Sequence, residues 1–304
     1  MKRMTSVLAL TTAAILGLSA CGGGGDPLAS DSPSGSSSAG GGAVVIGSAD
    51  FPESELLAEI YAGALKAKGI DATTKPRIGS REIYLKALED GSIQAIPEYT
   101  GAIGFFYDKN FKETDPEKVY TAIQSLIPAK FALLEKSAAE DNDSIVVTKA
   151  TADSKSLKTI EDLKAVAGQM SLGAPPEFKA RPQGVPGLTS TYGVTFKSFR
   201  ELTGQGLVQA LKNGQVDAAN IFTTDPSIAE NGFVSLEDTK KLFGSQNIVP
   251  LVAKDRADEL APALNAVSKA LTTEVISGLL KETVTDKKDA KDVAAEFLKA
   301  NNLG

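Results

Sequence analysis

One segment of this chain occurs twice, in residues 87–100 and again in residues 210–223, at a constant offset of 123 residues and without a gap. Each copy is typical of a helix that ends at a glycine and is followed by a short apolar strand and a loop. Ala-Leu-x-x-Gly is a common helix ending, so a chance match is the alternative, but this match continues through the strand and the loop. The repeat therefore predicts two similar α/β lobes. The shared residues are Ala87, Leu88, Gly91, Ala95 and Thr100 in the first copy, and Ala210, Leu211, Gly214, Ala218 and Thr223 in the second.

The repeat also indicates where a ligand would bind. Each loop carries an aromatic residue and then threonine: Tyr99 with Thr100 in the first copy, and Phe222 with Thr223 and Thr224 in the second. In open α/β sheets, ligands bind beyond the carboxyl ends of the strands. We therefore expect a ligand cleft between the lobes, with these loops facing it. A place in the hydrophobic core is the alternative for Tyr99.

The N-terminal segment predicts export and a lipid anchor. Lys2 and Arg3 precede an apolar run over residues 7–18, which is typical of a secretory signal peptide and too short to span a membrane as a mature helix. The run leads into Leu-Ser-Ala-Cys, which resembles the bacterial lipobox. That resemblance implies cleavage after residue 20 and a diacylglycerol on the thiol of Cys21; a free cysteine in an ordinary signal peptide is the alternative. Residues 21–42 are then a Gly/Ser-rich tether.

Composition narrows the classes of function. Removing residues 1–20 takes away Lys2 and Arg3 and moves the formal net charge from −6 to −8, which argues against a nucleic-acid partner and a basic membrane-binding surface. The chain has no histidine and one cysteine, which excludes Ser-His-Asp and Cys-His catalysis, His-based zinc sites and any disulfide framework. Ser-Lys chemistry and paired-carboxylate hydrolysis stay open. We expect no catalytic residues, no metal and no cofactor.

The folded body is expected over residues 43–304, with strands and helices alternating nearly throughout. That alternation predicts mostly parallel sheets covered by helices. We expect lobe 1 over residues 43–144 and 250–304, and lobe 2 over residues 145–249, joined by two hinge crossings. The helix-rich C-terminus carries an apolar stripe and is expected to pack back on lobe 1. The predicted strands include residues 44–47, 145–147, 170–173, 194–199, 216–221 and 248–252.

Three polar motifs call for separate interpretations. Gly204-Gln205-Gly206 lacks the downstream spacing of a phosphate-binding loop, so a helix-entry turn is favoured. Residues 141–143 read Asp-Asn-Asp but lack the glycine and glutamate of a calcium loop, so a turn is favoured here too. Arg181 lies in a loop punctuated by proline and glycine, where it can form a two-pronged contact with a carboxylate. An exposed loop charge is the alternative for Arg181.

Several separate motifs together resemble the ProX/OpuC-type substrate-binding proteins of osmoprotectant ABC importers. They follow one another in the order that the family has, cover essentially the whole body, and are most similar to actinobacterial ProX-like lipoproteins. The matching stretches are Gly47-Ser48-Ala49-Asp50-Phe51-Pro52-Glu53, Gly79-Ser80-Arg81-Glu82, Pro97-Glu98-Tyr99-Thr100-Gly101, Pro176-Glu177-Phe178 with Arg181-Pro182 and Pro186-Gly187-Leu188, and Phe222-Thr223-Thr224-Asp225.

The resemblance implies a two-lobed periplasmic-binding-protein fold of type II, whose ligands are glycine betaine, carnitine, choline and similar solutes. It also implies an aromatic cage that holds a quaternary ammonium by cation–π attraction, and an arginine that holds the carboxylate of betaine. Tyr99 matches a cage tyrosine and Arg181 matches that arginine. Other cage tyrosines of the family are absent from this chain. Their places fall near Asp143, Val185, Val208 and Asn247, and Asp143 can offer a charge to a cation instead.

We therefore predict an extracytoplasmic, lipid-anchored solute-binding protein that delivers a quaternary ammonium compound or a similar solute to an ABC permease and ATPase complex. Tyr99 and Arg181 are the leading ligand-binding candidates. A different small solute on the same scaffold is the first alternative, and a surface-anchored hydrolase is the second. Further candidates, chosen for their positions at strand ends, are Ser48, Asp50, Thr100, Phe222, Thr223 and Thr224.

Overall fold

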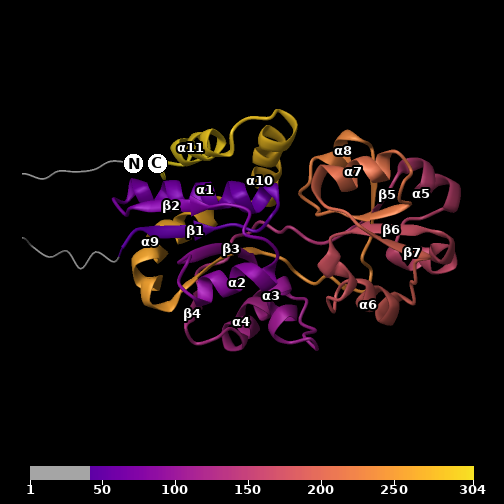
Figure 1. Cartoon of the computed structure of the whole chain (residues 1–304), viewed down its shortest axis with the longest axis horizontal. Helices are drawn as coiled ribbons and strands as arrows, with labels where there is room; N and C mark the ends of the chain where they lie inside the picture. Colours follow the sequence, from indigo (N-terminus) through magenta and orange to yellow (C-terminus); the bar gives the residue numbers. More distant parts are fainter. Residues whose placement is uncertain (1–41) are drawn as a thin grey trace, which may run out of the picture. The chain divides into compact units, whose positions relative to one another are not determined.

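A computed structural model describes residues 42–304 of the chain, in which two five-stranded sheets are each packed with helices (Figure 1). The predicted lipid anchor Cys21, the signal peptide and most of the tether lie outside the described residues. The strands of the first sheet are β1 (Val44–Gly47), β2 (Ala72–Lys75), β3 (Ala95–Tyr99), β4 (Phe131–Leu133) and β10 (Ile248–Ala253). The second sheet holds β5 (Ile145–Val147), β6 (Ser171–Ala174), β7 (Ser198–Glu201), β8 (Ala218–Asn220) and β9 (Val234–Leu236).

The helices divide between the two sheets in the same way, and we call the two groups lobe 1 and lobe 2. Lobe 1 contains α1 (Pro52–Ala67), α2 (Arg81–Glu89), α3 (Thr100–Tyr107), α4 (Pro116–Leu126), α9 (Ala257–Ala270), α10 (Thr273–Leu280) and α11 (Ala290–Ala300). Lobe 2 contains α5 (Lys149–Lys155), α6 (Val185–Gly187), α7 (Gly204–Lys212) and α8 (Ser227–Glu230). None of the helices in residues 42–304 combines the length and the apolar character that a membrane-spanning helix needs.

Both sheets are mixed, which corrects the prediction of mostly parallel pairing. The strand orders are β2-β1-β3-β10-β4 and β7-β6-β8-β5-β9. β10 is antiparallel to β3 and β4, and β5 is antiparallel to β8 and β9, while the other pairs are parallel. β5 and β10 are the strands by which the chain enters each sheet from the other lobe. No helical crossover within one sheet precedes them, so nothing forces them to run parallel to their neighbours.

The chain passes between the two sheets twice, after β4 and again before β10. The two crossing segments lie side by side, because Glu140 and Asn247 form an antiparallel bridge and the amide of Asp141 donates to the carbonyl of Gln246 at 3.1 Å. This pairing places residues 140–143 and 245–247 at the junction of the two lobes. The lobe boundaries predicted from the sequence stay predictions.

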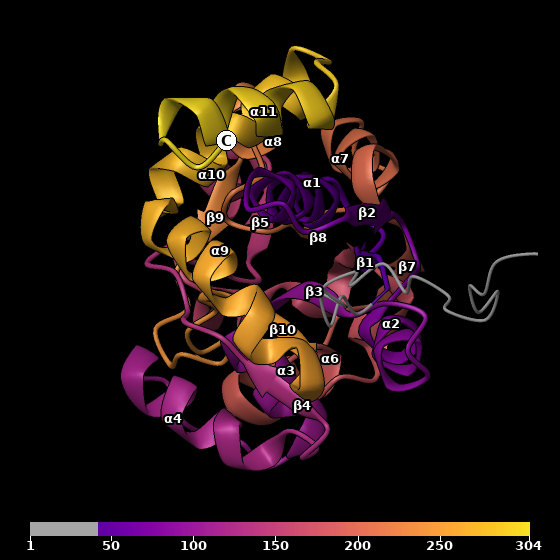
Figure 2. The ribbon, with the colours of Figure 1, turned by 90° about the vertical axis from the view of Figure 1, so that its left-hand side faces the viewer.

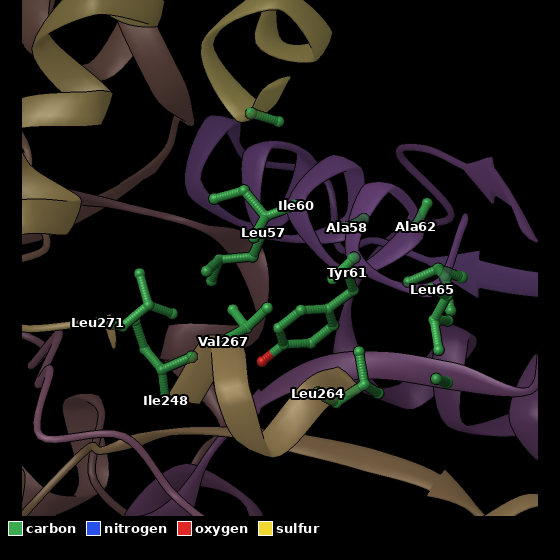
Figure 3. Packing of buried hydrophobic residues seen from close by; sticks show 14 of the residues in the cluster. Leu57, Ala58, Ile60, Tyr61, Ala62, Leu65, Ile248, Leu264, Val267 and Leu271 are labelled. Atoms are coloured by element: carbon green, nitrogen blue, oxygen red, sulfur yellow. The ribbon is translucent and has the colours of Figure 1, made fainter. Parts of the chain in front are cut away.

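α1 is the central helix of the lobe 1 core. Pro52 occupies its first turn, and Glu53 with Glu55 places negative charge at its N-terminus, where the helix dipole favours it. Figure 3 shows the ring of Tyr61 on α1 beside Leu264 and Val267 of α9. Fully burying a leucine or valine side chain in such a core contributes about 1.5–3 kcal/mol. The core therefore holds α1 firmly, and with it the residues at its N-terminus.

The C-terminal helices complete lobe 1, as the sequence predicts. α9, α10 and α11 all contact α1, and Figure 2 shows them alongside it. Val293, Phe297 and Leu298 on α11 are buried in the same core as α1. The chain that returns from lobe 2 thus supplies part of the core of lobe 1.

The sequence repeat corresponds to two equivalent helix-strand units. α2 and α7 are followed by Gly91 and Gly214, which have φ values of 78° and 68°, a backbone conformation that glycine adopts without strain. β3 and β8 follow, each in the interior of its sheet. The two units differ after the strand. Tyr99 directly precedes helix α3, whereas Phe222 lies in an irregular loop between β8 and α8.

Candidate functional site

A cavity of about 370 Å³ lies between the two lobes, and segments from both contribute to its lining. These segments follow the carboxyl ends of β1 and β3 in lobe 1 and of β6 and β8 in lobe 2. This is the position expected for a ligand in an open α/β sheet. The lining segments at and after these strand ends are residues 49–53, Tyr99 with Ala102, residues 175–178 and residues 220–222 with 224–226.

Three aromatic rings form one wall of the cavity. The ring of Phe51, in the loop between β1 and α1, lies 6.0 Å from that of Tyr99 and 5.4 Å from that of Phe222, with tilts of 37° and 34°. Phe51 therefore connects the aromatic residues of the two repeats. It belongs to the motif at residues 47–53, but its place between Tyr99 and Phe222 depends on segments far apart in the chain, so no local sequence pattern marks Phe51 as a site residue.

Two carboxyl groups share a hydroxyl beside this wall. Glu53, at the N-terminus of α1, and Asp141, in the first crossing segment, are each 3% exposed. The hydroxyl of Thr224 lies 2.7 Å from Oε2 of Glu53 and 2.8 Å from Oδ1 of Asp141. The hydroxyl of Tyr99 donates to Oε1 of Glu53 at 2.7 Å. The four residues form one hydrogen-bonded group that joins lobe 1, the crossing segment and lobe 2.

Burial determines the protonation of these carboxyls. Burial raises the pKa of Glu53, against hydrogen bonds from Tyr99 and Thr224 that favour the ionised form. Burial also raises the pKa of Asp141 well above its ordinary value, and the nearby charge of Glu53 adds to the effect. Two carboxylates this close in a buried site disfavour each other's ionisation, so the pair retains a proton more readily than exposed carboxyls do.

A buried ion pair fixes the adjacent end of β3. Arg81 donates from Nε to Oε1 of Glu98 at 2.8 Å and from Nη2 to Oε2 at 2.9 Å. Tyr84 donates its hydroxyl proton to Oε1 of the same carboxylate at 2.6 Å. Such a bidentate pair is stronger and more directional than a single hydrogen bond. Arg81 lines the cavity, but its guanidinium is committed to Glu98.

Arg181 lines the cavity from the loop after β6. Its guanidinium also lies 3.2 Å from the carboxylate of Glu82 on α2 and 3.8 Å from that of Glu177 in its own loop. Although partial burial works against it, hydrogen bonds and the charge of Arg181 lower the pKa of Glu82 to about 2. Arg181 is therefore already neutralised by carboxylates of the protein itself.

The remaining candidates divide into residues that line the cavity and residues that do not. Asp50, Phe222 and Thr224 line it. Ser48, Thr100 and Thr223 are not among the lining residues, and their hydroxyls serve internal hydrogen bonds. Ser48 accepts from the amide of Arg77, Thr100 accepts from that of Asn247, and Thr223 accepts from that of Asn142. Their positions at strand ends resemble those of the lining residues, but their side chains hold the loops together.

The four positions near which the family has cage tyrosines also divide into residues that line the cavity and residues that do not. Asp143 and Val208 line the cavity, whereas Val185 and Asn247 are not among the lining residues. Asp143 accepts a hydrogen bond from Nδ2 of Asn220 at 3.0 Å, and burial raises its pKa. Gln183 also lines the cavity; it is 2% exposed, and its Oε1 has no hydrogen-bond partner. Gln183 carries no signal in a single sequence that would mark it as a site residue.

The described part of the chain contains no cluster of three or more His, Cys, Asp or Glu side chains arranged to hold a metal ion. The cavity presents aromatic faces, buried carboxyls and amide groups to a ligand. The aromatic wall suits a positively charged or apolar group. The acidic group beside it favours positive charge.

Comparison with known proteins places the chain among solute-binding components of transporters. A family model described as the substrate binding domain of an ABC-type glycine betaine transport system matches residues 42–300. A glycine-betaine-binding protein of Pseudomonas aeruginosa is 26% identical over 273 residues, which cover 85% of this chain and 88% of that protein. A carnitine transport binding protein, OpuCC of Listeria monocytogenes, is 25% identical over 267 residues, which cover 84% of this chain and 86% of that protein.

The fold also matches solved structures. A crystal structure described as a glycine betaine/carnitine/choline ABC transporter protein superimposes with a TM-score of 0.68 at 23% identity, covering 86% of this chain and 99% of that one. The apo form of YehZ from Escherichia coli superimposes with a TM-score of 0.62 at 25% identity, covering 87% of this chain and 100% of that one. These likenesses confirm the predicted α/β fold with two lobes.

Proposed function

Because this chain belongs to the family of substrate-binding domains of ABC-type glycine betaine transport systems, we propose that its cavity binds a small solute with a quaternary ammonium group and that the protein delivers this solute to a membrane permease. The family membership confirms the resemblance stated from the sequence. Solute binding for an ABC importer is the role of the family. The particular solute, the residues that hold it and the lipid anchor belong to the proposal.

The observation that carries the proposal is the aromatic wall. Phe51, Tyr99 and Phe222 present three neighbouring rings to the cavity, with the carboxyls of Glu53 and Asp141 beside them. A desolvated cation–π contact contributes roughly 0.5–2 kcal/mol. Micromolar affinity needs about 8 kcal/mol, so a single ring does not suffice. Three rings together with buried negative charge supply a large part of that requirement.

The rest of the solute would meet the polar side of the cavity. Asp143, Arg181 and Gln183 line this side. The unpartnered Oε1 of Gln183 suits a hydroxyl or another donor on the ligand, because an unsatisfied buried acceptor costs about 1–3 kcal/mol. Arg181 suits a ligand carboxylate only when it weakens its contacts with Glu82 and Glu177.

Isothermal titration calorimetry with glycine betaine, choline, carnitine and ectoine tests this proposal directly. Saturable binding of at least one quaternary ammonium compound, with no chemical change in the recovered compound, supports it. Sugars and aromatic compounds in the same panel test whether the scaffold serves a different solute. Binding of these alone would contradict the proposal, and turnover of any compound would favour the hydrolase alternative.

We further propose that Cys21 carries a diacylglycerol, with residues 21–42 holding the folded part outside the cytoplasm near its permease. The support is the apolar run before Cys21 and the Gly/Ser-rich composition after it. Membrane fractionation of wild-type protein and a Cys21→Ala variant in the native host tests the anchor. We expect the variant to move to the soluble fraction; a variant that stays entirely with the membrane would contradict the anchor.

A further inference from the structure

The hydroxyl of Thr224 has one proton but two acceptors within hydrogen-bond distance. Its Oγ1 lies 2.7 Å from Oε2 of Glu53 and 2.8 Å from Oδ1 of Asp141. The hydroxyl can donate to only one of them. For the other short contact to be a hydrogen bond, that carboxyl must itself carry a proton and donate it to the hydroxyl. The geometry thus indicates that Glu53 and Asp141 together hold one proton in this arrangement.

The surroundings of this pair are acidic. Asp225 and Asp143 place further negative charge near Glu53 and Asp141, and Tyr99 and Tyr61 add no positive charge. The residues that line the cavity include six carboxyl groups and two guanidiniums but no lysine. Arg81 is paired with Glu98, and Arg181 with Glu82 and Glu177. The six carboxyl groups belong to Asp50, Glu53, Asp141, Asp143, Glu177 and Asp225.

We propose that a cationic solute binds in exchange for this proton: as the cation enters beside Phe51, Tyr99 and Phe222, the Glu53–Asp141 pair releases its shared proton to solvent. This inference rests on the proposed function. A positive charge within a few ångströms favours the ionised form of a carboxyl, so the second negative charge becomes tolerable only when the cation is present. One charge replaces another, and the net charge of the cavity is unchanged.

The exchange has a consequence for the class of solute. A cation without a carboxylate, such as choline, compensates the one negative charge that the released proton leaves behind. A zwitterion such as glycine betaine brings a carboxylate into a cavity whose two guanidiniums are already paired. The exchange therefore favours solutes with a net positive charge, and the carboxyl pair determines this specificity.

Calorimetry of the wild-type protein with choline and with glycine betaine, from pH 5.5 to 8.5, tests the inference. Each titration is repeated in two buffers that differ in ionisation enthalpy, which measures the protons released on binding. We expect release of up to one proton for choline, with affinity rising by as much as tenfold per pH unit where release is complete. Binding of choline with no proton release at any pH would overturn the inference.

Two variants locate the source of the proton. Glu53→Gln and Asp141→Asn each keep the size of the side chain but remove one titrating group, and either should abolish the release and flatten the pH dependence. Glu55→Gln, on the same helix but outside the lining, is the matched control and should behave as the wild type. Proton release that persists in both cavity variants would overturn the inference.

The same titrations distinguish a failure of the proton exchange from a failure of the proposed solute binding, on which the exchange rests. If only glycine betaine binds, without proton release, the solute-binding proposal stands and the exchange fails. If no quaternary ammonium compound binds at any pH, both fail. Because the wild-type measurement requires no substitution, the outcome does not depend on whether a variant folds.

Discussion

At the scale of single residues, the cavity contains groups that function requires but that folding does not favour. Glu53 and Asp141 are buried carboxyls whose pKa values are raised by that burial, and Phe51, Tyr99 and Phe222 are rings that face a cavity rather than a filled core. A core built only for stability would place apolar side chains at these positions. Such residues are the ones that substitution can change with separate effects on binding and on stability.

At Tyr99, the contributions of the ring and of the hydroxyl group to binding can be measured separately. We expect Tyr99→Ala to weaken binding of the quaternary ammonium ligand at least tenfold, because it removes one ring of the aromatic wall and the hydrogen bond to Glu53. Tyr99→Phe keeps the ring and should lose less affinity than Tyr99→Ala. Calorimetric titration of both variants measures the difference, and equal affinity of Tyr99→Ala and the wild type would refute this site.

The raised pKa of Glu53 predicts how stability depends on pH. A carboxyl whose folded pKa lies above its unfolded value of 4.5 binds protons more tightly in the folded state. Stability is therefore lost as the pH rises from about the unfolded value through the folded one, by up to about 1.4 kcal/mol per pH unit. In the ligand-free protein, Glu53→Gln should thus become more stable relative to the wild type as the pH rises.

Urea unfolding at several pH values between 4.5 and 8 measures that difference, with Glu55→Gln as the control. The lowered pKa of Glu82, at about 2, acts in the opposite direction and at lower pH. Its contribution is present above pH 4.5 and is lost as the pH falls toward 2, so the two windows do not overlap. A constant difference between Glu53→Gln and the wild type would contradict the raised pKa.

At the scale of elements, the sequence predicted the repeated helix-strand unit because its signals are local. Gly91 and Gly214 follow their helices with positive φ, and Tyr99 and Phe222 lie at or just after the ends of interior strands. The direction of β5 and β10 was not predictable, because it depends on strands from distant parts of the chain. Boundaries moved for the same reason: the strand expected at residues 194–199 is β7 (Ser198–Glu201).

Close packing at the start of α3 gives a test at this scale. A Cβ on Gly101 would lie 2.6 Å from the carbonyl oxygen of Ser245 in the returning crossing segment, whereas a Cβ on Gly206 of α7 meets no atom within 4 Å. We expect Gly101→Ala to destabilise the protein by about 1–3 kcal/mol, since backbone atoms must move. Gly206→Ala should be neutral or stabilising by up to about 1 kcal/mol. Chemical denaturation compares them; equal effects would contradict the close contact.

At the scale of the whole folded part, contacts between the lobes join residues that no sequence pattern connects. Glu53 and Thr224 are 171 positions apart, and Arg181 and Glu82 are 99 apart. The family resemblance directed attention to Tyr99 and Arg181, and both line the cavity. It did not indicate that Arg181 is paired with carboxylates of the protein, nor that Glu53 and Asp141 share a hydroxyl. These features arise only when the two lobes meet.

The ion pair between Arg181 and Glu82 joins the two lobes. It also affects which solute binds, because it occupies the guanidinium that a ligand carboxylate would contact. Glu82→Gln removes one of the two carboxylates near Arg181 and leaves the guanidinium more available to a ligand carboxylate, which it can bind in a bidentate manner. We expect this variant to bind glycine betaine several-fold more tightly relative to choline than the wild type does. Glu161→Gln, which breaks the ion pair with Lys240 within lobe 2, is the matched control and should leave the ratio unchanged. Competition calorimetry with the two solutes measures the ratio. If Glu82→Gln weakens both solutes equally, the pair acts only as a link between the lobes and Arg181 does not contact the carboxylate of the ligand.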